Sequence, residues 1–133
     1  MNFTKTTSYS LNILTYMANH SNESMPAEYL HLQLGIPYQY LRHILTKLSR
    51  TGFINSSRGR GGGFELKRDI STIYIADVIE AMEGLDGFYK CILGFQECPF
   101  YNKCAIHNLW DESRNNILNI LKQTSLANLI KKQ

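Results

Sequence analysis

The sequence predicts a mainly α-helical fold with one small β-hairpin, and three observations lead to this fold class. Apolar residues recur three and four positions apart through most of the first fifty residues, as on one face of a helix. A turn rich in arginine and glycine separates two short strand-like segments within residues 53–67, and a long helical apolar stripe follows near the C-terminus. A chain of 133 residues fits one domain, or one domain with an oligomerisation arm.

The first helix is expected over residues 4–19 and is followed by a polar turn at 20–24. A second, short helix should begin near Pro26 and end at Gly35. Proline fits the first turn of a helix, and glycine adopts the left-handed conformation that commonly ends one.

A third helix is expected between Pro37 and Gly52, with apolar residues at helical spacing. Two helices joined by so short a link form a helix-turn-helix candidate, although such pairs also occur in helical bundles with no role in DNA binding. The exposed positions of the third helix are expected to be Tyr38, Gln39, Arg42, His43 and Lys47, with Tyr40 either at the same surface or half-buried. Among them, Gln39 and Arg42 have side chains suited to adenine and guanine edges.

The segment after Gly52 reads as strand, glycine turn, strand, with the turn over residues 58–63. Arg58 and Arg60 alternate with glycines there, including Gly61, so that the backbone can approach a ligand closely while the guanidinium groups meet phosphates or a narrow minor groove. A merely solvated turn is the alternative. A hairpin directly after a helix-turn-helix is the wing of a winged helix-turn-helix domain, which we therefore expect.

The positive charge of the chain is concentrated in its first half, which points to an anionic partner. Residues 1–70 contain eight Lys/Arg and four Asp/Glu, whereas residues 71–133 contain six and seven. Double-stranded DNA is the expected partner.

A further helix over 75–83, ended by Gly84, is expected to lead into a loop at 85–104 and a long helix over 105–122. The long helix has more apolar surface than one small core covers, so we expect it to pair with its copy in a homodimer. Its expected stripe comprises Ile106, Leu109, Trp110, Ile117, Ile120 and Leu121. The predicted organisation is a DNA-binding domain at 1–84, a loop at 85–104, and a C-terminal dimerisation helix and tail at 105–133. The cysteines described next make 85–104 a candidate cluster-binding loop.

The only three cysteines of the chain, Cys91, Cys98 and Cys104, lie in this loop, and His107 follows three residues later. Thiolates and imidazole are ligands for iron–sulfur clusters or zinc. The intervening gaps of six, five and two residues favour a cluster, because structural zinc usually takes ligand pairs two to four residues apart. A zinc site, a thiol switch and three buried small side chains remain as alternatives.

Several classes of protein are disfavoured by the composition. No apolar run approaches the roughly 20 residues that span a bilayer, and the first residues lack a basic start followed by a hydrophobic core. An odd number of cysteines suits a reducing compartment better than a disulfide framework. We therefore expect a cytoplasmic protein without a membrane partner, and neither an enzyme nor a binder of a small-molecule substrate.

The whole chain resembles the iron–sulfur winged-helix transcription regulators typified by IscR and NsrR. The resemblance rests on the first helix, the link at Gly35-Ile36, the wing at 58–64 and the cysteine triad, and on the segments 76–84, 104–110 and 124–129. It implies a homodimer that binds an operator and senses cluster status, redox state or nitric oxide. We expect this homodimer to act as a repressor.

The resemblance also bears on the fourth cluster ligand. A histidine three residues after the last cysteine ligates a 2Fe–2S cluster in the group that regulates cluster biogenesis, and His107 matches that position. In the nitric-oxide-sensing group an acidic side chain near the start of helix one, from the partner subunit, completes a 4Fe–4S cluster, and Ser8 stands there in this chain. The resemblance thus favours 2Fe–2S over 4Fe–4S.

Two residue patterns depart from the family. The first gap between cysteines is six residues where both groups have five, and Arg42 stands where the biogenesis regulator has an acidic residue that helps to choose between operators. The target DNA sequence therefore does not follow from the resemblance. A small electron-transfer protein is the alternative from another class, and the arginine–glycine wing argues against it.

Overall fold

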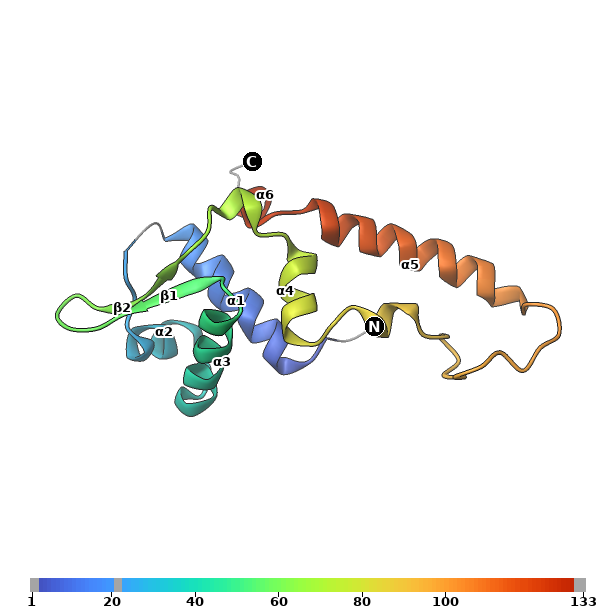
Figure 1. Cartoon of the computed structure of the whole chain (residues 1–133), viewed down its shortest axis with the longest axis horizontal. Coiled ribbons are helices and arrows are strands. Elements are labelled where there is room, and N and C mark those ends of the chain that lie inside the picture. The colour runs from blue at the N-terminus through green and yellow to red at the C-terminus, as the bar shows by residue number, and fades with distance from the viewer. Residues whose placement is uncertain (1–2, 21–22, 131–133) are drawn as a thin grey trace.

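The computed structural model describes residues 3–20 and 23–130 and has the expected fold class, a helical body with one two-stranded antiparallel hairpin. Figure 1 shows α1, α2, α3, α4 and the hairpin gathered into one body, from which the long α5 extends to one side. The elements in chain order are α1 (Lys5–Asn19), α2 (Ala27–Leu34), α3 (Tyr38–Arg50), β1 (Ile54–Ser57), β2 (Gly63–Leu66), the 3₁₀ turn η1 (Ile70–Thr72), α4 (Ile75–Met82), the 3₁₀ turn η2 (Asp86–Tyr89), α5 (Ala105–Gln123) and α6 (Leu126–Ile130).

The helix boundaries follow from local signals in the sequence. Thr4 precedes α1, and its hydroxyl accepts a hydrogen bond from the backbone N–H of Thr7 at 3.2 Å. Gly35 ends α2 in the left-handed conformation, with φ of 67°, and Pro37 then precedes α3. The polar turn expected at 20–24 lies partly outside the described residues.

The core is built around the inner face of α3, which packs against α1 and α2. All four apolar positions expected for this helix are fully buried, because residues three and four apart share one helical face. They are Leu41, Ile44, Leu45 and Leu48. From α1 and α4, the residues Ile13, Leu14, Val78 and Ile79 complete the centre of the core.

The hairpin is attached to the helical body at its base. Ile54 pairs with Leu66 and Ser57 with Gly63, so that residues 58–62 form the loop between the strands. Met25, just before α2, exchanges two backbone hydrogen bonds of 2.8 Å with Phe64. This pairing fixes the direction of the wing relative to the helix-turn-helix.

The chain after α5 returns to the body through α6, an element that sequence reasoning did not predict. Leu126 is fully buried, and its N–H donates to the carbonyl of Ile73 at 2.9 Å. The N–H of Ile75 donates to the carbonyl of Thr124 at 3.0 Å. The C-terminal end of α5 is therefore attached to the segment at the start of α4. The final residues, including Lys131 and Lys132, lie outside the described part.

The outer surface of α5 is more apolar than one core requires, as the sequence indicates. Leu118, which was not assigned to the stripe, is the residue of α5 that is buried, whereas Ile106, Leu109 and Ile120 are exposed. None of the helices in the described ranges is long and apolar enough to cross a membrane.

Gly63 provides a test of the wing attachment. A Cβ at this position would lie 2.5 Å from the carbonyl carbon of Met25, in a backbone conformation with φ of 151°. We expect Gly63→Ala to lower the free energy of unfolding by about 1–3 kcal/mol, measured by urea denaturation. The control is Gly87→Ala, where a Cβ meets nothing within 4 Å and the change should stay within about 0.5 kcal/mol. Equal effects of the two substitutions would contradict the conclusion that the close approach of Gly63 to Met25 attaches the wing to the body.

Candidate functional site

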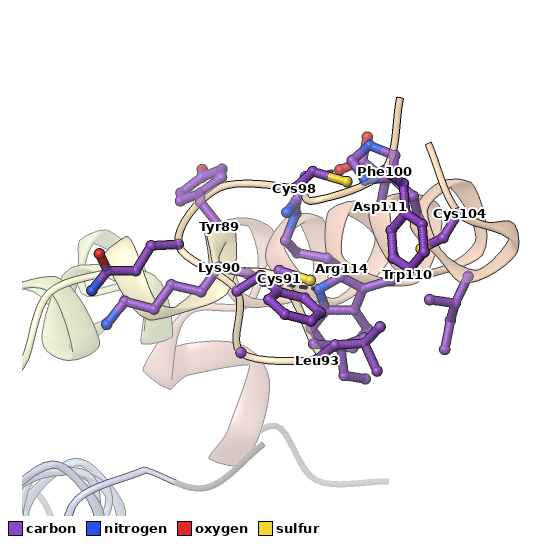
Figure 2. A pocket seen from close by; sticks show the side chains of 16 residues that line it. Tyr89, Lys90, Cys91, Leu93, Cys98, Phe100, Cys104, Trp110, Asp111 and Arg114 are labelled. Carbon is purple, nitrogen blue, oxygen red and sulfur yellow. Dashed lines mark hydrogen bonds and ion pairs between the residues drawn. The ribbon is translucent and has the colours of Figure 1, made fainter. Parts of the chain in front are cut away.

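A pocket of about 580 Å³ lies between the segment 89–104 and the first half of α5. All three cysteines are on its wall (Figure 2). His107 also lines it. The structure thus brings together the four residues that the sequence singled out, at the far end of α5 from the point where α6 rejoins the body (Figure 1).

The loop is attached mainly near its beginning. Phe88 of η2 is buried, and its ring centroid is 6.0 Å from that of Phe3 ahead of α1. The indole N–H of Trp110 donates to the carbonyl of Lys90 at 3.1 Å. Between these attachments and the start of α5, every residue from 89 to 103 is exposed. The shape of the loop is therefore determined by few contacts.

The cysteines are accessible rather than packed into the core. Cys91 and Cys98 are exposed, and Cys104 is half-buried at the N-terminal cap of α5. This excludes the reading of the three as buried small side chains. His107 follows on the first turn of α5, where its N–H donates to the carbonyl of Cys104 at 3.1 Å.

The sulfurs line one pocket without converging on one point. Figure 2 shows Cys91, Cys98 and Cys104 on separate parts of the wall. Among the described residues, no three Cys, His, Asp or Glu side chains are grouped closely enough to hold a metal ion. The donor set fits an iron–sulfur cluster chemically, with three thiols and one imidazole facing one hollow, and the exposed loop leaves room for the sulfurs to approach one another.

The pocket also contains charged residues that the sequence reasoning missed. Asp111 and Arg114 lie four and seven positions after His107, on the same face of α5, and form an ion pair on the pocket wall. This spacing was the signal that could have revealed them. Ile106 and Trp110, which were assigned to the dimer stripe, also line the pocket.

The outer surface of α3 contains part of the expected DNA-reading set. Gln39, Arg42 and His43 are exposed, whereas Tyr38 is half-buried. The guanidinium carbon of Arg42 lies 5.9 Å from the centroid of the Tyr38 ring. Tyr38 packs in turn edge-on against His31, at 5.6 Å between centroids. Arg42 is thus braced at the exposed surface of the helix.

Tyr40 points into the protein and not toward a ligand. It is half-buried, its hydroxyl is 2.7 Å from Oγ1 of Thr6, and its ring meets the edge of Tyr9 at 5.5 Å between centroids. Tyr40 therefore connects α3 to α1. This agrees with the half-buried alternative, and a contact of Tyr40 with DNA stays a prediction.

Lys47 also differs from the expectation that it is exposed. It is half-buried, and its Nζ donates to the backbone carbonyl of Met82 at 3.0 Å. Met82 is the last residue of α4, where carbonyl groups lack helical partners and the helix dipole favours a cation. Lys47 thus caps α4.

The two arginines at the tip of the wing are exposed, as the sequence predicts. Arg58, Arg60 and Gly61 are exposed, and neither arginine forms an ion pair with any residue in the described ranges. Gly59 and Gly61 have φ of 92° and 74°, and the N–H of Gly62 donates to the carbonyl of Gly59 at 2.9 Å. These glycines make the tight turn that presents both guanidinium groups to solvent.

Comparisons with known proteins agree with this architecture. The family model described as Rrf2, iron-dependent transcriptional regulator, matches residues 3–132. The HTH-type transcriptional regulator IscR of Xenorhabdus nematophila is 31% identical over 134 residues, covering 100% of this chain and 81% of that protein. The matched family and relatives are transcription regulators and not enzymes, in agreement with the sequence-based expectation.

Solved structures confirm the winged-helix fold class. CymR, the global cysteine regulator of B. subtilis, superimposes with a TM-score of 0.81 at 21% identity, covering 98% of this chain and 96% of that one. IscR of T. potens superimposes with a TM-score of 0.77 at 20% identity, covering 98% and 87%.

The role of Lys47 can be separated from DNA binding. We expect Lys47→Met to lower the free energy of unfolding by about 1 kcal/mol, because the carbonyl of Met82 loses a charged donor. Arg50→Met, at an exposed position of the same helix, should change it by less than about 0.5 kcal/mol in the same urea titration. The salt dependence of DNA binding should not change in Lys47→Met, and a smaller slope would instead indicate a phosphate contact.

Proposed function

We propose a specific role for this chain, which belongs to the Rrf2 family of transcriptional regulators. It binds operator DNA as a homodimer and changes its DNA affinity with the state of an iron–sulfur cluster. In this proposal it acts in the cytoplasm as a repressor. The single observation that supports cluster sensing is the pocket, whose wall contains all three cysteines of the chain together with His107.

Cys91, Cys98 and Cys104 would hold the cluster through their sulfurs, with His107 as the fourth ligand. Bound there, the cluster would supply one-electron redox chemistry and sensitivity to oxidants or nitric oxide. The imidazole favours a 2Fe–2S cluster over 4Fe–4S, by similarity to the family group that has a histidine at this position. By holding the cluster, these four residues would also fix the conformation of the loop, which few other contacts within the chain determine.

A short structural connection from the loop to the DNA-reading helix supports the regulatory part of the proposal. The loop follows α4 closely, and the N–H of Leu85 donates to Oε2 of Glu80 on α4 at 2.8 Å. Two residues after Glu80, the carbonyl of Met82 accepts from Lys47 on α3. A change in the loop would therefore shift the end of α4 and, through Lys47, the recognition helix.

DNA binding would use two surfaces of each subunit. Gln39, Arg42 and His43 would face base edges in the major groove, while Arg58 and Arg60 would contact phosphates or the minor groove. Two subunits would place α3 helices about 34–36 Å apart, one turn of the duplex. A small change in dimer geometry would then alter affinity strongly.

The dimer is proposed to form along α5. Leu109 and Ile120 of this helix are 65% and 63% exposed, and α5 extends away from the body in Figure 1. Large exposed apolar side chains on one helix favour association. In this organisation residues 1–84 bind DNA, 85–104 bind the cluster, and 105–133 form the dimer helix and tail.

The two DNA-facing surfaces should respond differently to substitution. Replacing Arg58 and Arg60 by Ala should weaken binding to all duplexes and reduce the salt slope by about one to two units, since fewer counterions are released. Arg42→Ala should instead lose discrimination at one or two base pairs, at about 1–3 kcal/mol each. Fluorescence anisotropy with an operator selected from random duplexes and with a scrambled duplex measures both effects.

Lys122→Ala, which removes an exposed cation from α5, is the control and should leave the slope unchanged. A uniform loss of affinity for all sequences in Arg42→Ala would contradict its assignment to base reading.

The cluster proposal predicts a brown protein after anaerobic purification. Replacing any one of Cys91, Cys98 or Cys104 by Ala should abolish the colour, because the chain has no spare cysteine. His107→Ala should give a labile cluster and His107→Cys a retained cluster with an altered absorption spectrum. Iron and sulfide counts with visible spectroscopy provide the measurement.

Ser8→Ala is the matched control and should leave the spectrum unchanged. A colourless anaerobic protein with stoichiometric zinc would overturn the cluster proposal in favour of a zinc site. An unchanged spectrum and stability in His107→Ala would exclude that residue as a ligand.

A further inference from the structure

Arg114 is an unusually placed cation for this protein. Among the described lysines and arginines, only Lys47 and Arg114 are half-buried, and the side chain of Arg114 is 14% exposed. Lys47 has the carbonyl of Met82 as a partner. Burying a guanidinium group costs free energy unless other groups compensate its charge and its N–H donors.

The partners of Arg114 compensate it incompletely. One terminal nitrogen forms an ion pair with Oδ1 of Asp111, and the guanidinium carbon lies 5.4 Å from the centroid of the Tyr89 ring. The Nε atom is buried and has no hydrogen-bond partner among the described residues. A buried donor without a partner calls for an explanation, and an anion bound nearby is one.

The location of Arg114 identifies the kind of anion. It lies on the wall of the cysteine pocket, where the other formally charged side chains, apart from cysteine and histidine, are Lys90 and Asp111. Lys90 is exposed to solvent, so its charge is well screened. Three cysteine thiolates would add three negative charges to this wall. Arg114 is the half-buried positive charge that lines the same pocket (Figure 2).

We infer that Arg114, oriented by Asp111 and Tyr89, is the charge-compensating residue of the cluster site and raises its reduction potential. This inference rests on the proposed cluster. An external reductant transfers one electron to the site, whose net charge becomes more negative by one, with no bond made or broken. A fixed positive charge nearby stabilises the reduced state more than the oxidised state, and a fixed negative charge does the opposite.

Arg114 and Asp111 therefore have opposite predicted effects, although they form one ion pair. Arg114 should raise the reduction potential, and Asp111 should partly offset this because its carboxylate is on the same wall. If the ion pair only stabilised α5, the two substitutions should have similar effects on the potential. Breaking it from either side would loosen the same turn of α5 and shift the potential in the same direction.

The test is a redox titration of the full-length protein, purified anaerobically, with dithionite as reductant and visible absorption as the readout. Arg114→Gln should shift the midpoint potential to more negative values, and Asp111→Asn should shift it to more positive values. Arg114→Lys retains the charge and should stay closer to the wild-type potential than Arg114→Gln. Far-UV circular dichroism of each variant checks that α5 remains folded.

Shifts of the same sign in Arg114→Gln and Asp111→Asn, or no shift in either, would overturn the inference while leaving cluster sensing intact. If Arg114→Gln binds no cluster, Asp111→Asn decides, since a rise in potential supports the inference and no rise overturns it. A wild-type protein that contains no iron or sulfide after anaerobic purification would overturn both the inference and the proposed function.

Discussion

Burial of one face of α3 is the constraint on which the rest of the structure depends. Its four apolar residues, fully removed from solvent, join α1 and α2 around a common centre. Burying a side chain of this size contributes about 1.5–3 kcal/mol, so the group sets the orientation of the helix firmly. Gln39, Arg42 and His43 are exposed because the opposite face is committed to the core. The recognition surface is thus a consequence of packing.

The cysteine pocket, in contrast, is formed by a loop that is exposed and has few packing contacts. Its loop is exposed from residue 89 to 103 and is attached by Phe88 on one side and by the hydrogen bond from Trp110 to Lys90 near it. Such a segment opens and closes at low cost in free energy. A packed body that presents α3 and the wing is therefore combined, in one chain, with an exposed loop that contains all three cysteines.

The two half-buried cations lie on either side of the loop in the chain. Lys47 joins α3 to the last carbonyl of α4, just before the loop begins. Arg114 lies on α5, beyond the loop, and pairs with Asp111 on the pocket wall. Both replace solvent contacts by specific partners, which makes their positions sensitive to the geometry of their neighbours. Lys47 thus links α3 to the helix that precedes the loop, and Arg114 lies on the helix that follows it.

The sequence by itself determined the elements whose signals are local. Helical spacing, Gly35, the arginine–glycine turn and the three cysteines indicated the winged helix and the loop before the long helix, and the structure agrees to within a few residues. Only the tertiary structure decided the direction of side chains at the edge of a helical face. Lys47 and Tyr40 lie at such edges, and partners distant in the chain, Met82 and Thr6, draw them inward. The positions of Arg114 and of α6 were not predicted either, because Arg114 packs against Tyr89 and α6 against the segment before α4, and these contacts depend on how the chain beyond the loop returns to the body.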